Sequence, residues 1–151
     1  MPALSKEIIG STLESFNMRI EREALQSFCA AIGETNPIYL DRDAAVAAGF
    51  RDTPIPPTFQ TSFLFKGYGY EKFWETLRSF GIDTNRLLHT KQEYSYFEPV
   101  YPDDVITGKA EIIEVRTGKL EMATLKTVYR NQEDKVCIEE ILGIMIRPEG
   151  M

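Results

Sequence analysis

The second half of the chain constrains the fold most. It contains three long runs with strand character, at residues 105–115, 120–130 and 136–146. Only Thr117-Gly118 and its neighbours separate the first two runs, and residues 131–134 separate the last two. Short links join antiparallel neighbours, because parallel strands need a crossover of a dozen or more residues. A shorter run at 92–97 also alternates. We therefore expect an antiparallel sheet in this half.

The first half begins with one strand and one helix. Phe16, Met18 and Ile20 alternate with polar residues, which is typical of a strand over 15–20. From Glu21 to Ile32 the period changes to three and four, which predicts an amphipathic helix. This order predicts an α+β fold in which the antiparallel sheet wraps around the central helix 21–32. That helix should bury Leu25, Phe28 and Ile32.

The next elements are shorter. Gly33 should end the first helix in a left-handed conformation, and the turn 34–37 follows. Asp41 is placed to cap a short helix over 42–48. After the proline-rich segment 50–57, an amphipathic run starts near residue 58. Gly67-Tyr68-Gly69-Tyr70 interrupts that run, so we expect two helices there.

Composition narrows the class of protein. The 151 residues, 43% hydrophobic and 26% charged, suit one globular domain over 1–151. A net charge of −6 argues against nucleic acid or an anionic membrane as the main partner. No apolar run approaches the roughly 20 residues of a membrane span, and no signal peptide is evident. Cys29 and Cys137 lack metal-ligand spacing and should be small core residues in a reducing compartment. We expect a soluble, cytoplasmic protein with no metal and no cofactor.

Four segments in order carry a family resemblance. Residues 31–41, Ala-Ile-Gly-Glu-Thr-Asn-Pro-Ile-Tyr-Leu-Asp, resemble the hydratase motif of MaoC-like proteins, which runs Asp, any residue, Asn, Pro, aliphatic, His, any residue, Asp. The other three segments are Ala44-Ala45 with Gly49-Phe50, residues 55–59, and Tyr96-Phe97-Glu98-Pro99-Val100 with Asp103-Asp104. Together they cover nearly the whole chain. The sequence is most similar to the N-terminal MaoC-like dehydratase branch, and the resemblance implies a hot-dog fold.

The resemblance also implies site residues. Glu34 stands at the motif's catalytic Asp, Tyr39 at its catalytic His, and Asn36, as a substrate-binding residue, at its Asn. The oxyanion donor would be the backbone N–H of Thr58, flanked by the substrate-binding positions Pro57 and Phe59. A carboxylate is retained, but a phenol with a pKa of about 10 is a poor base at neutral pH. The catalytic pair therefore departs from the family at both positions.

Each of these residues also has an ordinary structural interpretation. Glu34 can be a solvated residue at a helix end, Asn36 a cap of the turn, and Tyr39 a packed aromatic. His89, the only histidine, lies just before the run 92–97; it can be structural, or it can replace the missing imidazole. Core packing explains most of the aromatic run between 59 and 74, although a gate over an acyl tunnel would have the same composition.

Three functions remain open. The first is reversible hydration of an enoyl thioester carried on coenzyme A (CoA) or on acyl-carrier protein (ACP). The second is a non-catalytic acyl-binding and dimerisation subunit, whose related partner holds an intact Asp and His. A hot-dog thioesterase is the third, and the order of the motifs argues against it. The fold also predicts a dimer, either with itself or with a related hydratase, because a hot-dog sheet has open edges.

Overall fold

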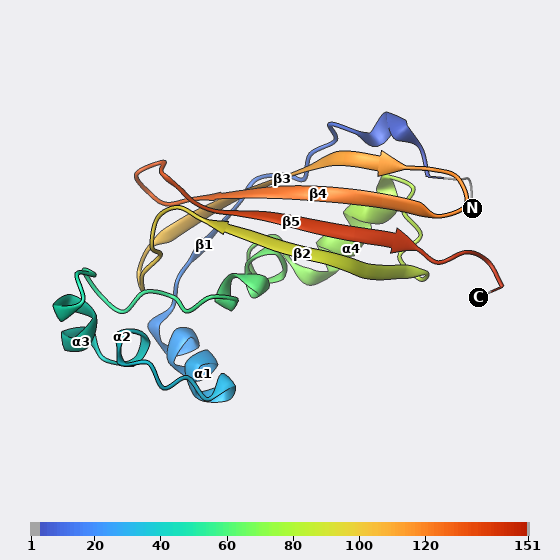
Figure 1. Cartoon of the computed structure of the whole chain (residues 1–151). Coiled ribbons are helices and arrows are strands. Elements are labelled where there is room, and N and C mark those ends of the chain that lie inside the picture. Colours follow the sequence, from blue (N-terminus) through green and yellow to red (C-terminus); the bar gives the residue numbers. More distant parts are fainter. Residues whose placement is uncertain (1–3, 151) are drawn as a thin grey trace.

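In the computed structural model, which describes residues 4–150, the strands form one antiparallel sheet in the order β1-β3-β4-β5-β2. Figure 1 shows this sheet, and the pairing is antiparallel at every junction. The strands are β1 (Phe16–Arg19), β2 (Leu87–Tyr96), β3 (Val105–Arg116), β4 (Glu121–Arg130) and β5 (Val136–Ile146). The expected antiparallel sheet and the α+β class are confirmed.

Within residues 4–150, four α-helices accompany the sheet: α1 (Arg22–Ile32), α2 (Pro37–Leu40), α3 (Arg42–Ala47) and α4 (Tyr70–Ser79). Gly33 ends α1 with φ 68°, the left-handed cap that the sequence predicts. The Asp41 side chain accepts a hydrogen bond from the Asp43 N–H, which confirms the predicted cap of α3. Helix α2 was not expected, because the sequence predicted only the turn 34–37 and no further element before the helix that Asp41 caps.

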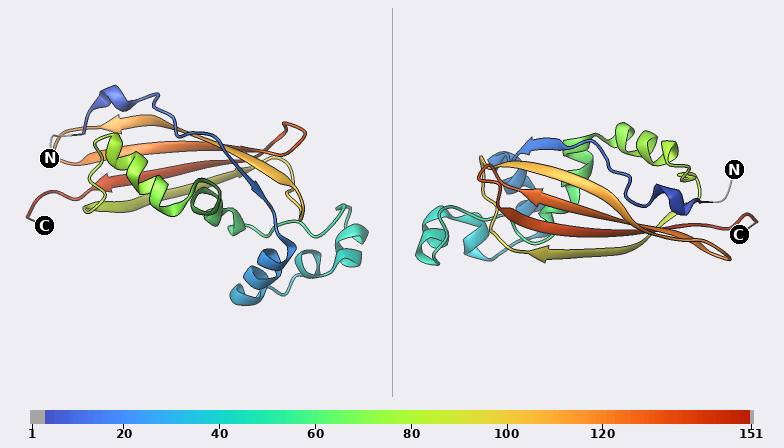
Figure 2. Two further views of the ribbon diagram at one scale, coloured as in Figure 1. Left: turned by 180° about the vertical axis from the view of Figure 1, so that it is seen from behind. Right: turned by 90° about the horizontal axis from the view of Figure 1, so that it is seen from above.

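The helix that the sheet covers is α4, and the prediction that it would be 21–32 was wrong. Figures 1 and 2 show α4 and the turns before it along one face of the sheet, whereas α1, α2 and α3 lie beyond the end of the sheet. Leu25 is buried as predicted, but Phe28 is only half-buried and Ile32 is 50% exposed. Periodicity identifies an amphipathic helix but does not say which surface its apolar stripe meets.

Only the second of the two helices expected after residue 58 is an α-helix. Phe59–Ser62 is a 3₁₀ turn and Leu64–Tyr68 is a π turn. Thr58, with φ 77°, and Gly69, with φ 105°, lie outside the helical region at the two ends of this segment. The segment therefore crosses the sheet as irregular turns and becomes regular only at Tyr70.

The core lies between α4, its preceding turns and the sheet. Phe63, Phe73 and Leu77 are at most 2% exposed, and the Phe63 ring meets Tyr129 of β4 edge-on with centroids 5.4 Å apart. Burying each large apolar side chain contributes about 1.5–3 kcal/mol. Cys29 and Cys137 are both buried free thiols, which confirms that they fill the core. Among residues 4–150, no helix is long and apolar enough to cross a membrane.

Candidate active site

Glu34 and Asn36 order the loop that follows α1. The Oε1 atom of Glu34 accepts hydrogen bonds from the N–H groups of Thr35 and Asn36, at 2.9 and 2.8 Å. Asn36 Oδ1 in turn accepts from the N–H of Ile38 at 3.2 Å and so caps α2. Both side chains therefore have structural partners, and the second carboxylate oxygen of Glu34 makes none of the hydrogen bonds found within residues 4–150.

Tyr39 of α2 contributes to a cavity of about 260 Å³, called here the Tyr39 cavity. Burial raises the pKa of Tyr39, and the nearby acidic groups of Glu34, Cys29 and Tyr96 raise it further. The phenol is therefore a hydrogen-bond donor at neutral pH and not a base. The cavity is lined by Tyr39, Phe50, Pro54, Ile55, Pro57, Tyr96, Phe97, Glu98, Pro99, Val100 and Ile138.

Thr58 has a backbone conformation that is costly for its residue type. A β-branched residue with φ 77° and ψ −12° is a left-handed outlier of order 1–3 kcal/mol. Its neighbour Pro57 lines the Tyr39 cavity, and both residues are exposed. No hydrogen bond found within residues 4–150 uses the Thr58 N–H. An unpaired donor on a strained turn beside a cavity suits an oxygen-binding role.

The remaining predicted site residues lie elsewhere. Phe59 is 6% exposed and packs edge-on against Phe28 and Phe63, so it supports the turn from the core side and does not line the Tyr39 cavity. His89 belongs to β2 and not to a loop before it, and it lines a second cavity. Its Nε2 is 3.0 Å from the carbonyl oxygen of Lys91. A β-bulge between these two residues interrupts the alternation of side chains along β2, which hid the start of the strand in the sequence.

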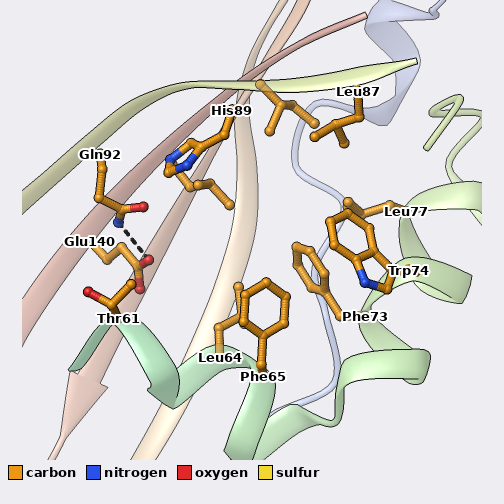
Figure 3. Close-up of a pocket in the computed structure, with 12 residues that line it drawn as sticks. Thr61, Leu64, Phe65, Phe73, Trp74, Leu77, Leu87, His89, Gln92 and Glu140 are labelled. Carbon is orange, nitrogen blue, oxygen red and sulfur yellow. Dashed lines mark hydrogen bonds between the residues drawn. The ribbon is translucent and has the colours of Figure 1, made fainter. Parts of the chain in front are cut away.

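This second cavity lies between α4 and the sheet and has a volume of about 230 Å³. Figure 3 shows polar side chains gathered at one end and hydrocarbon and aromatic side chains at the other. Because it contains the buried carboxyl of Glu140, we call it the Glu140 cavity. Its lining residues are Thr61, Leu64, Phe65, Phe73, Trp74, Leu77, Leu87, His89, Gln92, Glu140, Leu142 and Ile144.

Sequence reasoning missed Glu140. The side chain is 4% exposed, and it accepts hydrogen bonds from Gln92 Nε2 at 2.8 Å and from the Tyr129 hydroxyl at 2.7 Å. Burial raises its pKa, while the hydrogen bonds and the neighbouring His89 act in the opposite direction. The signal was present in the run Ile138-Glu139-Glu140-Ile141, where a strand alternation places one glutamate on the apolar face.

The two cavities are neighbours along the inner face of β2 and β5. Ile138 lines the Tyr39 cavity and Glu140, two residues further along β5, lines the Glu140 cavity. Tyr94, paired with Glu140 in the sheet, donates a hydrogen bond at 2.9 Å to the Oγ1 atom of Thr61, which lines the Glu140 cavity. Next to it, the buried Gln60 donates to the Tyr96 hydroxyl at 2.6 Å. Within residues 4–150, no group of three His, Cys, Asp or Glu side chains could hold a metal ion.

The comparisons with known proteins agree with this architecture. Residues 7–140 match the family described as the FAS1-like dehydratase domain region. The chain belongs to this family of MaoC-like hot-dog dehydratases. A UPF0336 protein of Streptomyces griseus is 33% identical over 118 residues, which cover 76% of this chain and 75% of that protein.

Two solved structures illustrate the shared fold. One is the HadBC (3R-hydroxyacyl-ACP dehydratase) complex of Mycobacterium tuberculosis. It aligns with a TM-score of 0.75 and 18% identity, over 91% of this chain and 96% of that one. The other is the (R)-hydratase from A. caviae, with a TM-score of 0.67 and 18% identity, over 93% and 96% of the two chains. At this identity the likeness establishes the hot-dog fold.

Proposed function

We propose that this protein adds water reversibly to an enoyl thioester carried on CoA or ACP. The observation that carries the proposal is the strained, unpaired Thr58 N–H beside the Tyr39 cavity, with Glu34 close enough for its charge to raise the pKa of Tyr39. Of this donor, acid and carboxylate, Tyr39 lines the cavity, whereas Thr58 follows the lining residue Pro57 in the chain and Glu34 is not among the lining residues. Membership of the dehydratase family supports the same chemistry.

Each residue has a distinct role in this proposal. The Thr58 N–H binds the thioester carbonyl oxygen and stabilises the negative charge that develops there. The Glu34 carboxylate, through its free oxygen, takes a proton from water as the water oxygen adds to C3, and then delivers that proton to C2 of the enolate. In the reverse direction the carboxylate takes the C2 proton and gives it to the hydroxyl on C3, which leaves as water. Tyr39 donates a hydrogen bond that orients the water.

Crotonyl-CoA hydration, followed by loss of the enoyl absorbance, tests the proposal. Glu34→Gln should lower the rate by about 10²-fold or more, because it removes the proton acceptor. Tyr39→Phe deletes one hydrogen bond of roughly 1 kcal/mol and should cost only about fivefold. Tyr39→His should raise the rate by restoring an imidazole.

The matched control is Glu23→Gln, the same substitution at an exposed position near the start of α1, and it should leave the rate unchanged. Equal rates for Glu34→Gln and Glu23→Gln would refute the role of Glu34. If neither the wild type nor Tyr39→His hydrates crotonyl-CoA, the isolated chain does not have the proposed activity.

The second candidate is an acyl-binding subunit that dimerises with an active hydratase. Glu34 and Tyr39 replace the motif's Asp and His, and two structural neighbours, HadBC and ChsH1-ChsH2, are complexes. Co-purification from the native host distinguishes the two functions. A stable companion hydratase, together with an inactive isolated chain, supports the subunit, and an active isolated chain supports the enzyme.

A further inference from the structure

The Glu140 cavity has two chemically different ends. Thr61, Gln92 and Glu140 gather at one end, and Figure 3 shows Leu77 and Leu87 at the other. A site for a plain hydrocarbon has no need of a carboxyl, and burying one without a cation costs free energy. The polar end therefore requires an explanation beyond packing.

The carboxyl of Glu140 has hydrogen-bonding capacity left over. Gln92 donates to Oε1 and Tyr129 donates to Oε2, so each oxygen has one protein partner and room for another. Both partners are neutral, and burial holds the pKa of Glu140 above its ordinary value. In its protonated form the carboxyl can also donate. A ligand hydroxyl or carbonyl at this end would find both kinds of partner.

The polar end is also the end nearer to the Tyr39 cavity. Along β5, the inward side chains run from Ile138 through Glu140 to Leu142 and Ile144. At about 3.4 Å per residue, this row is roughly 20 Å long. An extended chain that starts in the Tyr39 cavity and follows this row would reach Glu140 part of the way along and end among apolar side chains.

We infer that the Glu140 cavity receives the far part of the acyl chain and that Glu140 and Gln92 select a chain with an oxygen substituent, hydroxyl or carbonyl, at mid-chain. The inference rests on the proposed function for the thioester class, and it names the kind of acyl group. The hydrocarbon beyond the substituent packs against Leu77, Leu142 and Trp74.

Trp74, the only tryptophan of the chain, lines this cavity and provides the readout. The experiment titrates the protein with dodecanoyl-CoA and with its mid-chain monohydroxylated forms, and follows Trp74 emission. We expect the best hydroxylated ligand to bind on the order of fivefold more tightly than the plain one, the size of one hydrogen bond. Equal affinities, or no change in Trp74 emission with any of these ligands, would overturn the inference.

Two variants test the residues. Gln92→Leu removes one hydrogen-bond partner of Glu140 from the half-buried edge strand. The double variant Tyr129→Phe/Glu140→Leu removes the carboxyl, and with it the Tyr129 hydroxyl that would otherwise be left unpaired. In both, the preference for the hydroxylated chain should disappear, while dodecanoyl-CoA binds at least as well. Gln26→Leu, on the exposed side of α1, is the matched control and should keep the preference. A preference that persists in both cavity variants would show that the cluster is structural only.

Failure of this inference and failure of the proposed function give different results. Glu140 lies two residues beyond Ile138 along β5, which is about 7 Å, so a short crotonyl group held in the Tyr39 cavity should not reach it and its hydration should not depend on Glu140. Hydration without any hydroxyl preference removes only the inference. A hydroxyl preference without hydration removes only the proposed enzyme and leaves a selective acyl-binding protein.

Discussion

At the scale of single residues, the chain uses side chains that are unusual for their surroundings at two places. Thr58 holds a left-handed backbone that a β-branched residue adopts at a cost, and Glu140 is a buried carboxyl with neutral hydrogen-bond partners. Both border a cavity, Thr58 through its neighbour Pro57. Such local costs persist where the surrounding structure fixes them, and they concentrate at functional sites.

Glu140 should make stability depend on pH. Its pKa is raised by burial in the folded protein, so the folded state binds the proton more tightly than the unfolded state. The stabilisation is complete below the unfolded pKa, near 4.5, and is lost as the pH rises through the folded pKa. In the variant Glu140→Gln the new side chain does not titrate, and the amide of Gln92 can rotate to accept a hydrogen bond from it.

Urea unfolding of wild type and Glu140→Gln at a series of pH values checks this. The free energy of unfolding of the variant should increase relative to that of wild type as the pH rises above about 4.5. A difference between the two proteins that stays constant from acid to neutral pH would contradict the raised pKa.

At the scale of elements, close approach decides which residues the strands can carry. Phe16 of β1 is paired with Gly108 of β3, and its ring lies directly over that glycine. A Cβ at Gly108 would be 2.3 Å from Phe16 Cζ, far inside van der Waals contact. The same ring meets Tyr68 and Tyr129 edge-on, so it has little room to move.

Gly108→Ala should therefore destabilise the protein by about 1–3 kcal/mol, the usual cost of overpacking a core. Chemical denaturation measures it. Phe16→Leu in the same background should recover part of the loss, since a smaller side chain vacates the space. If the two substitutions are simply additive, the contact between Phe16 and Gly108 is not the cause.

At the scale of the whole molecule, the sheet has two unequal edges. β1 has four residues, whereas β2 has ten and pairs on one side only. Leu88, Tyr96 and Phe97, in or next to β2, are 42%, 52% and 58% exposed. A long edge with exposed apolar groups is a template for pairing with another strand. We therefore expect the dimer to form through β2.

Light scattering should give the mass of a dimer at micromolar concentration. Leu88→Lys adds a charge beside the β2 edge of each copy and should weaken the dimer by about tenfold or more. Ile113→Lys places the same charge on β3, an interior strand, at a similarly exposed position, and should leave the dimer intact. A monomer in wild type would favour a heteromer with a related hydratase, and equal effects of the two variants would place the interface elsewhere.

Local patterns in the sequence determined four of the five strands and the second half of β2, the α1 helix with its Gly33 cap, the Asp41 cap and the family. These features depend on residues that are close together in the chain, where alternation, period and capping act directly. The motif 31–41 likewise identified the segment that contains Glu34, Asn36 and Tyr39, although not the helix α2 to which Tyr39 belongs.

Only the tertiary structure decided which amphipathic segment the sheet covers, because both α1 and α4 have an apolar stripe and the pattern does not identify its partner. It also placed His89 with Glu140 and away from Tyr39, since strand pairing and one β-bulge determine which residues share a cavity. The carboxyl of Glu140 meets Gln92 and Tyr129 from two neighbouring strands, a contact between residues far apart in the chain. Long-range pairing of this kind leaves no local signal in the sequence.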